Sequence, residues 1–233
     1  MKNMRNMKTF GAKSKKPLHV LHALHGEGLL WLCLVLALSA CTSGPPPPVQ
    51  DSGAYERGVA ADRVQKDAAF RAPGNEDSPI LAADRVRFEG LSYFPVDPTY
   101  RVPASLAEEE QVKPIVIELQ TSINTRRRMR KVGALKFTLA GTPLALTAFA
   151  DVDVRTPTRL FVPFGDLTNV DATYRGGRYL DLDRTPTGFY DLDFNRAYHP
   201  YCVYNPTYEC PVPPRENRLA TAILAGERLP AAK

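Results

Sequence analysis

The stretch DLDFNRAYHPYCVYNPTYECPVPP, residues 191–214, carries most of the side-chain types that could do chemistry in this chain. It contains carboxylates, one histidine and two cysteines, together with four tyrosines and five prolines. Carboxylates can bind Ca²⁺ or act as acid and base, and cysteines with a histidine can hold a metal. Prolines and a cysteine pair can instead brace a loop. The pattern favours the brace, with a candidate site where the stretch begins, at Asp193 and Asn195.

Aspartates alternate with apolar residues in YLDLD, residues 179–183, and YDLDF, residues 190–194. Because strand side chains alternate between two faces, all four carboxylates fall on one face. The five residues between Asp183 and Phe189 predict a hairpin that places Asp181 opposite Asp191. Two interpretations stay open: a carboxylate cluster that binds a cation or works as acid and base, and a solvated face paired with arginines. Four arginines close in the sequence favour the second.

The elements that must position these residues are mostly strands. The predicted strands cover residues 115–120, 135–139, 144–148, 160–164, 179–183 and 189–193. Ala140 to Pro143 supplies a turn, so the strands on either side of it form a predicted hairpin. Residues 221–225 fit a strand or a helix, and residues 54–70 carry apolar side chains on helical spacing. The sequence therefore predicts a mainly β fold, an antiparallel barrel or sandwich with one N-terminal surface helix.

The first 40 residues predict a signal peptide. Six basic residues precede an apolar run of 12 residues, Leu29 to Ala40. A membrane-spanning helix needs about 20 apolar residues, whereas a run of this length is typical of a secretory signal. The run ends in Leu38-Ser39-Ala40-Cys41, which resembles the processing box of bacterial lipoproteins. The resemblance implies cleavage before Cys41 and its acylation with fatty acids such as palmitate.

The expected organisation is a cleaved signal over 1–40, a tether over 41–53 and one β-rich domain over 54–233. The tether is rich in proline, glycine and serine and predicts a semi-extended spacer. Its lipid would make the membrane a partner and keep the domain outside the cytoplasm. Thr42 rather than aspartate follows Cys41. In a host with two membranes, that pattern predicts the outer membrane, facing the periplasm.

The net charge of +5 does not indicate a nucleic-acid partner. Six of the 30 lysines and arginines, and one of the 25 acidic residues, lie in the first 40 residues. The remaining chain is therefore neutral. Its charge gives no argument for binding nucleic acid.

Cys202 and Cys210 are the cysteines left beside Cys41 once the signal is removed. An extracytoplasmic compartment is oxidising, so this even pair predicts a disulfide. Two cysteines eight residues apart, with His199 as the one histidine outside the leader, do not match the usual zinc spacings. A disulfide would also silence Cys202 as a nucleophile.

From Phe161 onward the chain resembles a family of unknown function, domain-of-unknown-function family 1684. The resemblance rests on FVPFGDLT, TYRGGRYLDL, LDFNRAYHPYCVY, YECPVPPRENRL and AGER, with DSPI and FEGLSYFPVDPTYRV upstream. It covers about residues 55–228 and implies one compact domain but no activity. The positions marked by it are Asp166, Thr168, Tyr174, Gly177, Arg178, Tyr179, Asp193, Asn195, Tyr198, Cys202, Cys210, Asn217 and Glu227. Family members usually show asparagine in place of His199, which weakens any mechanism that needs this histidine.

Two function classes follow. The preferred one is a membrane-anchored lipoprotein whose domain binds a ligand or an envelope partner and performs no chemistry. The alternative is a hydrolase-type or metal-dependent enzyme whose site joins Asp166, Arg178, Asp193 and Asn195. No cofactor is predicted for the first class, and the second admits a divalent cation.

Overall fold

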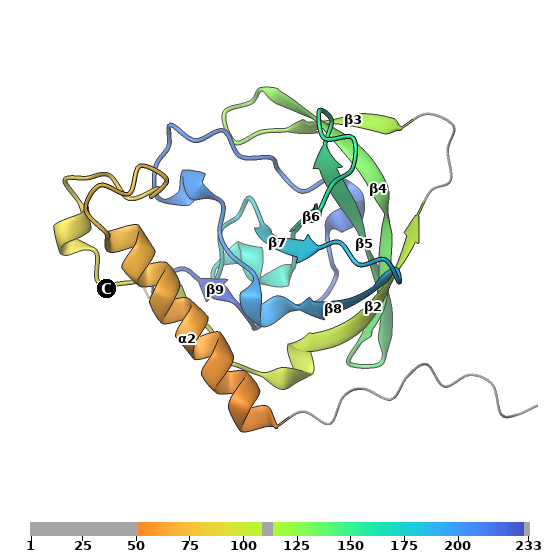
Figure 1. Cartoon of the computed structure of the whole chain (residues 1–233), viewed down its shortest axis with the longest axis horizontal. Coiled ribbons are helices and arrows are strands. Elements are labelled where there is room, and N and C mark those ends of the chain that lie inside the picture. Colours follow the sequence, from red (N-terminus) through yellow and green to blue (C-terminus); the bar gives the residue numbers. More distant parts are fainter. Residues whose placement is uncertain (1–50, 109–113, 231–233) are drawn as a thin grey trace, which may run out of the picture. The chain divides into compact units, whose positions relative to one another are not determined.

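The computed structural model describes residues 51–108 and 114–230 (Figure 1). Seven strands form one antiparallel sheet in the order β7-β6-β5-β4-β2-β8, and β3 pairs with β4 beside this path. A separate pair joins β1 to β9. The regular elements are α2 (Ser52–Arg71), β1 (Ser92–Tyr93), β2 (Arg101–Glu108), β3 (Ile115–Gln120), β4 (Arg126–Leu139), β5 (Thr142–Asp151), β6 (Arg159–Phe164), β7 (Arg178–Asp183), β8 (Phe189–Asp193) and β9 (Glu227–Arg228). The expected mainly β, barrel-like fold with one helix is confirmed.

The long strand β4 pairs with two different strands along one edge and contains a bulge. Its first half pairs with β3 and its second half with β2. The register of β4 against β5 shifts between Lys131 and Gly133, and such a bulge bends a strand. Gly133 is required there, since a Cβ atom would lie 2.4 Å from the carbonyl oxygen of Ala107 on β2. The bend brings the sheet close to closing on itself.

The strands bury apolar side chains on both faces of the sheet. The larger cluster fills the inside of the barrel and includes Leu135, Leu146, Leu160, Leu180 and Leu192. A second, smaller cluster is formed by Leu119, Met129 and Phe149, with Ile117 and Phe161 packed against it. Neighbouring residues such as Leu160 and Phe161 belong to different clusters because they point to opposite faces. The outer face of the sheet therefore carries an apolar cluster that is separate from the barrel core.

Helix α2 lies along one side of the strands in Figure 1, with C-terminal segments between it and the sheet. Asp51 caps it, accepting a hydrogen bond from the amide of Ala54 at 3.2 Å. Only Val59 and Phe70 are buried within it. Polar contacts must therefore contribute much of its attachment. The predicted helix over 54–70 is confirmed.

The predicted hairpin around the Ala140–Pro143 turn is also confirmed, as β4 and β5. The predicted hairpin of β7 with β8 is wrong, because β7 pairs with β6 and β8 with β2. The two strands lie at opposite ends of the strand order. Asp191 therefore faces Pro103 and hydrogen-bonds Arg101 instead of opposing Asp181. This arrangement separates the like charges that a hairpin would have set against each other.

The segment 221–225, which fits a strand or a helix in the sequence, is neither. The predicted signal peptide, the acylation site Cys41 and the tether up to residue 50 lie outside the described residues. Among the residues that the structure does describe, no helix is both long and apolar enough to cross a membrane.

Candidate functional site

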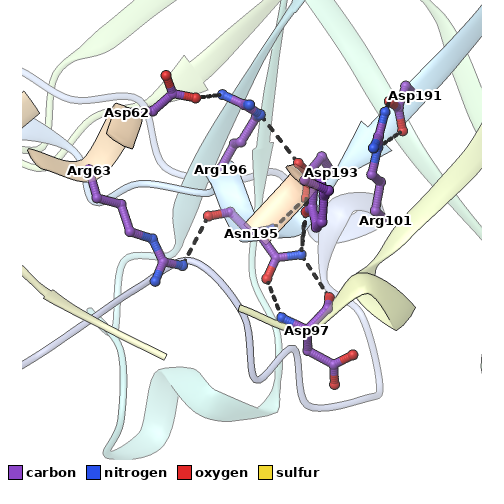
Figure 2. Close-up of polar contacts among 9 residues, drawn as sticks. Asp62, Arg63, Asp97, Arg101, Asp191, Asp193, Asn195 and Arg196 are labelled. Atoms are coloured by element: carbon purple, nitrogen blue, oxygen red, sulfur yellow. Dashed lines mark hydrogen bonds and ion pairs between the residues drawn. The ribbon is translucent and has the colours of Figure 1, made fainter. Parts of the chain in front are cut away.

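Asp193 lies at the end of β8 and is buried. Its Oδ1 atom accepts hydrogen bonds from the hydroxyl of Tyr55 at 2.8 Å and from the amide of Asn195 at 3.0 Å. Figure 2 shows Asp193 between Asn195 and Arg196. Its Oδ2 atom lies 3.2 Å from Nε of Arg196. The carboxylate thus starts a short turn, Phe194–Arg196, and binds the helix through Tyr55. Burial and the neighbouring carboxylate raise the pKa of Tyr55, which keeps that hydroxyl a donor.

Asn195 uses both ends of its side-chain amide (Figure 2). Its oxygen accepts from the amide of Asp97 at 2.9 Å, and its nitrogen donates to the Asp97 carbonyl at 2.8 Å and to Tyr55 at 2.9 Å. Arg63 of α2 donates to the Asn195 carbonyl at 3.4 Å. Asp193 and Asn195 therefore join three segments: α2, the turn before β2 and the end of β8. We call these two residues and Tyr55 the helix anchor.

Asp166 and Arg178 form an ion pair at 2.9 Å, with both side chains 0 % exposed. Arg178 also donates to the carbonyl oxygens of Ile223, Ala225 and Glu227. Asp166 in turn accepts from the amide of Ile223 at 3.2 Å. Burial lowers the pKa of Arg178, and the Asp166 carboxylate opposes that shift. The pair clamps residues 223–227 against the barrel, and we call it the C-terminal clamp.

The four residues of the predicted site thus fall into two networks. None of the hydrogen bonds and ion pairs of the helix anchor joins it to Asp166 or Arg178. In both networks most side-chain polar atoms are engaged with the chain itself, and Nε of Arg178 is the buried exception in the clamp. Within residues 51–108 and 114–230, no group of three or more His, Cys, Asp or Glu side chains is placed to hold a metal ion. What the two networks visibly do is connect distant segments.

A third buried group, around Glu227, was not found as a site from the sequence. Its carboxylate accepts from Lys66 at 2.6 Å, from Tyr204 at 2.9 Å and from the amide of His199 at 2.7 Å. His199 accepts at Nε2 from the amide of Tyr174 at 3.2 Å. Burial, with Arg178 and Lys66 nearby, lowers the pKa of His199 to about 3, so the ring is neutral. The spacing of Tyr55, Val59, Arg63, Lys66 and Phe70 along α2 was the signal for this inward face.

The predicted disulfide is not formed: Cys202 and Cys210 are free thiols. The amide of Cys202 donates to the sulfur of Cys210 at 3.2 Å, so hydrogen bonds hold the two residues together in place of a covalent bond. A hydrogen bond from Cys210 lowers the pKa of the Cys202 thiol, and Ser122 and Tyr174 add to that shift. The same contact, together with burial, raises the pKa of the Cys210 thiol.

The outer face of the sheet carries a pocket of about 570 Å³, which we call the outer pocket. The segment 198–211 and Lys66 of α2 form the wall opposite the strands. Five aromatic rings line it: Phe161, Tyr179, Tyr198, Tyr201 and Tyr208. Tyr179 packs edge-on against Phe161 at 4.7 Å between ring centroids and against Tyr198 at 5.7 Å. The rings therefore form a fixed, mostly apolar wall of the kind that small-molecule sites use.

Comparisons with known proteins give the family. The model of the family described as "Protein of unknown function (DUF1684)" matches residues 86–228. The chain belongs to this family. It is 40% identical to the uncharacterized protein from gene locus rrnAC0354 of Haloarcula marismortui, whose solution NMR structure aligns with a TM-score of 0.59. That match covers 77% of this chain and 96% of the other. No curated protein matches the chain.

The positions marked by the DUF1684 resemblance have two different surroundings. Most of the polar ones are buried braces: Asp166, Arg178, Asp193, Asn195, Asn217 and Glu227. Asn217, for example, bonds Thr147 on β5 and donates to the Pro163 carbonyl at 2.7 Å. Tyr179, Tyr198 and Cys210 instead line the outer pocket. The DUF1684 pattern therefore includes part of this pocket as well as the braces.

Proposed function

We propose that this protein binds a small ring-containing ligand in the outer pocket while a lipid on Cys41 holds it outside the cytoplasm. The observation that carries the binding function is the aromatic wall around a volume of about 570 Å³. Small-molecule sites have volumes of about 300–1,000 Å³ and are lined mainly by apolar and aromatic side chains with a few polar groups. In this proposal the domain is a binding module and catalyses no reaction.

The tyrosines of the wall also offer polar groups to a ligand. Within residues 51–108 and 114–230, the hydroxyls of Tyr201 and Tyr208 have no hydrogen-bond partner, although both side chains are half-buried. The hydroxyls of Tyr179 and Tyr198 are engaged, with the Pro211 carbonyl and with Asp181. A ligand could stack on the rings and accept a hydrogen bond from either free hydroxyl.

Binding should be tested on the full-length protein purified in detergent. A thermal-shift screen of envelope metabolites should contain compounds that raise its melting temperature, because a ligand that binds the folded state stabilises it. Tyr201→Ala and Tyr208→Ala should abolish these shifts. Phe189→Ala removes an aromatic ring that is 62% exposed outside the outer pocket and is the matched control. Shifts that survive both tyrosine variants would place binding elsewhere.

The lipid anchor is supported by the order of basic leader, apolar run and processing box before Cys41. It would keep the domain outside the cytoplasm, and on the periplasmic face of the outer membrane in a host with two membranes. Cells grown with a clickable palmitate analogue should label the wild-type protein and not Cys41→Ala. Mass spectrometry of the wild-type protein should find a chain that begins at an acylated Cys41. A chain that retains residues 1–40 would refute this part of the proposal.

A further inference from the structure

The chemistry of the ligand can be inferred from the charged residues around the outer pocket, provided the proposed function holds. The sheet register places these residues. Phe161 lies opposite Phe149 on β5 and opposite Asp181 on β7, so all three share the outer face. Two residues away from Phe161 on β6 is Arg159, which points the same way and lies opposite Asp183.

Arg127 reaches the same face from β4. It lies two residues before Met129, which pairs with Asp151 on β5. Arg127, Arg159 and Lys66 bring three positive charges to the pocket, and Asp151, Asp181 and Glu209 bring three negative ones. Total charge therefore does not select a ligand. The hydrogen bonds that each group already makes decide what it can still bind.

The acidic groups and the lysine are already engaged, Asp151 through the amide of Asp153 at 3.4 Å. Asp181 accepts from the hydroxyl of Tyr198 at 2.8 Å, and Glu209 accepts from the hydroxyl of Thr125. Lys66 donates to Glu227 at 2.6 Å, and its ammonium lies 4.7 Å from the centre of the Tyr198 ring. A cationic ligand would have to displace these contacts or share the ring with Lys66.

The two arginines are different. Arg127 approaches Asp151 only to 3.7 Å, and Arg159 approaches Asp183 only to 3.6 Å, both beyond hydrogen-bond distance. Their side chains are 49% and 66% exposed, so these ion pairs are screened and weak. Arg101 and Arg184 elsewhere in the sheet, by contrast, hydrogen-bond their carboxylates. The open charged donors at the pocket are therefore these two guanidinium groups, beside the free hydroxyls of Tyr201 and Tyr208.

We propose that the ligand of the outer pocket is a ring-containing carboxylic acid. Its ring packs against Phe161, Tyr179 and Tyr198, and its carboxylate binds Arg127 and Arg159. The planar guanidinium group matches a carboxylate with two parallel hydrogen bonds, which makes this contact stronger than one between neutral groups. The ion pairs of these arginines with Asp151 and Asp183 are long and weak, so the ligand carboxylate can replace them.

Three indole compounds test this class on the full-length protein by isothermal titration calorimetry. Indole-3-acetate carries a carboxylate, indole-3-acetamide is its neutral analogue and tryptamine carries an ammonium group on the same ring. Indole-3-acetate should bind about tenfold more tightly than the amide, as expected for hydrogen bonds to a charged group, and tryptamine should bind most weakly. Benzoate and phenyl phosphate separate the two anions that a guanidinium can bind. Tighter binding of phenyl phosphate would overturn the carboxylate assignment.

The double variant Arg127→Gln and Arg159→Gln should bind indole-3-acetate and indole-3-acetamide equally, with the affinity for the amide unchanged. Arg128→Gln is the matched control, because Arg128 is exposed on the same strand but points to the other face. A carboxylate preference that persists in the double variant would overturn the inference. Equal binding of all three compounds by the wild type would overturn it too, and leave the proposed function intact. If none of them binds, the carboxylate class is wrong, and the proposed function is decided by its own screen with the tyrosine variants.

Discussion

The buried networks and the outer pocket use the same residue types in opposite ways. In the C-terminal clamp, Arg178 is fully buried and donates to one carboxylate and three backbone carbonyls. At the pocket, the side chains of Arg127 and Arg159 are exposed and make no hydrogen bond within residues 51–108 and 114–230. A buried arginine whose terminal nitrogens are bonded to the chain stabilises a fold, whereas an arginine with open donors beside an aromatic wall is available to a ligand. The distinctive polar residues of the sequence are of the first kind.

The largest effect should come from breaking the C-terminal clamp. Arg178→Met leaves Asp166 buried without a counter-charge and leaves the carbonyls of residues 223, 225 and 227 without this donor. The free energy of unfolding should fall by about 3–5 kcal/mol, measured by urea denaturation. Arg175→Met changes an exposed arginine in the same segment and should have little effect. Equal stability of the two variants would remove the distinction between the two regions.

Breaking the helix anchor should cause the second-largest loss of stability. Asn195→Ala leaves the amide of Asp97 without its partner and removes one hydrogen bond each from the Asp97 carbonyl and the Tyr55 hydroxyl. A loss of about 2–3 kcal/mol is expected in the same denaturation experiment, with faster hydrogen exchange in α2. Binding of indole-3-acetate by the folded protein should not change. A variant that keeps its stability but loses the ligand would show that Asn195 belongs to a binding site.

The pH dependence of stability should report the buried His199. Its pKa is lowered from 6.5 to about 3, chiefly because burial disfavours the charged ring. Between these values the unfolded chain binds the proton and the folded chain does not, so acidification destabilises the fold. From pH 7 to pH 5, the free energy of unfolding should fall by about 2 kcal/mol through this residue. His199→Asn should lack that part of the decrease, and an unchanged pH profile would contradict the buried, neutral ring.

The smallest effect on stability is expected at the outer pocket. Arg127→Gln removes only an exposed ion pair of 3.7 Å, so the free energy of unfolding should change by less than about 0.5 kcal/mol. Ligand affinity should fall in the same variant. A large loss of stability without a loss of affinity would make Arg127 a brace like Arg178.

Parts of the fold follow from local patterns. The spacing of apolar residues predicted α2 to within two residues at its start, and the alternation around Ala140 and Gly141 predicted the hairpin of β4 and β5. The same alternation failed to choose a partner for β7, because both β6 and β8 present apolar faces of the same period. The cysteine rule failed at Cys202 because it depends on compartment and number and contains no geometry.

The candidate site was predicted less well. Asp166, Arg178, Asp193 and Asn195 were predicted to share one site, and the structure divides them between two braces. The outer pocket was not predicted, although three of its four tyrosines lie in the stretch 191–214. Nothing in their spacing shows that some rings face a cavity.

By itself the sequence determined the mainly β class, the helix and the expectation of a lipid anchor, because each depends on residues that are neighbours along the chain. Tertiary structure alone decided which polar groups are saturated. Tyr55 meets Asp193 across 138 residues, and Lys66 meets Glu227 across 161. The same long-range packing places Arg127 and Arg159 beside the aromatic wall, where their guanidinium groups donate no hydrogen bond to the described part of the chain. The satisfaction of a hydrogen-bonding group depends on distance in space, which local periodicity does not encode.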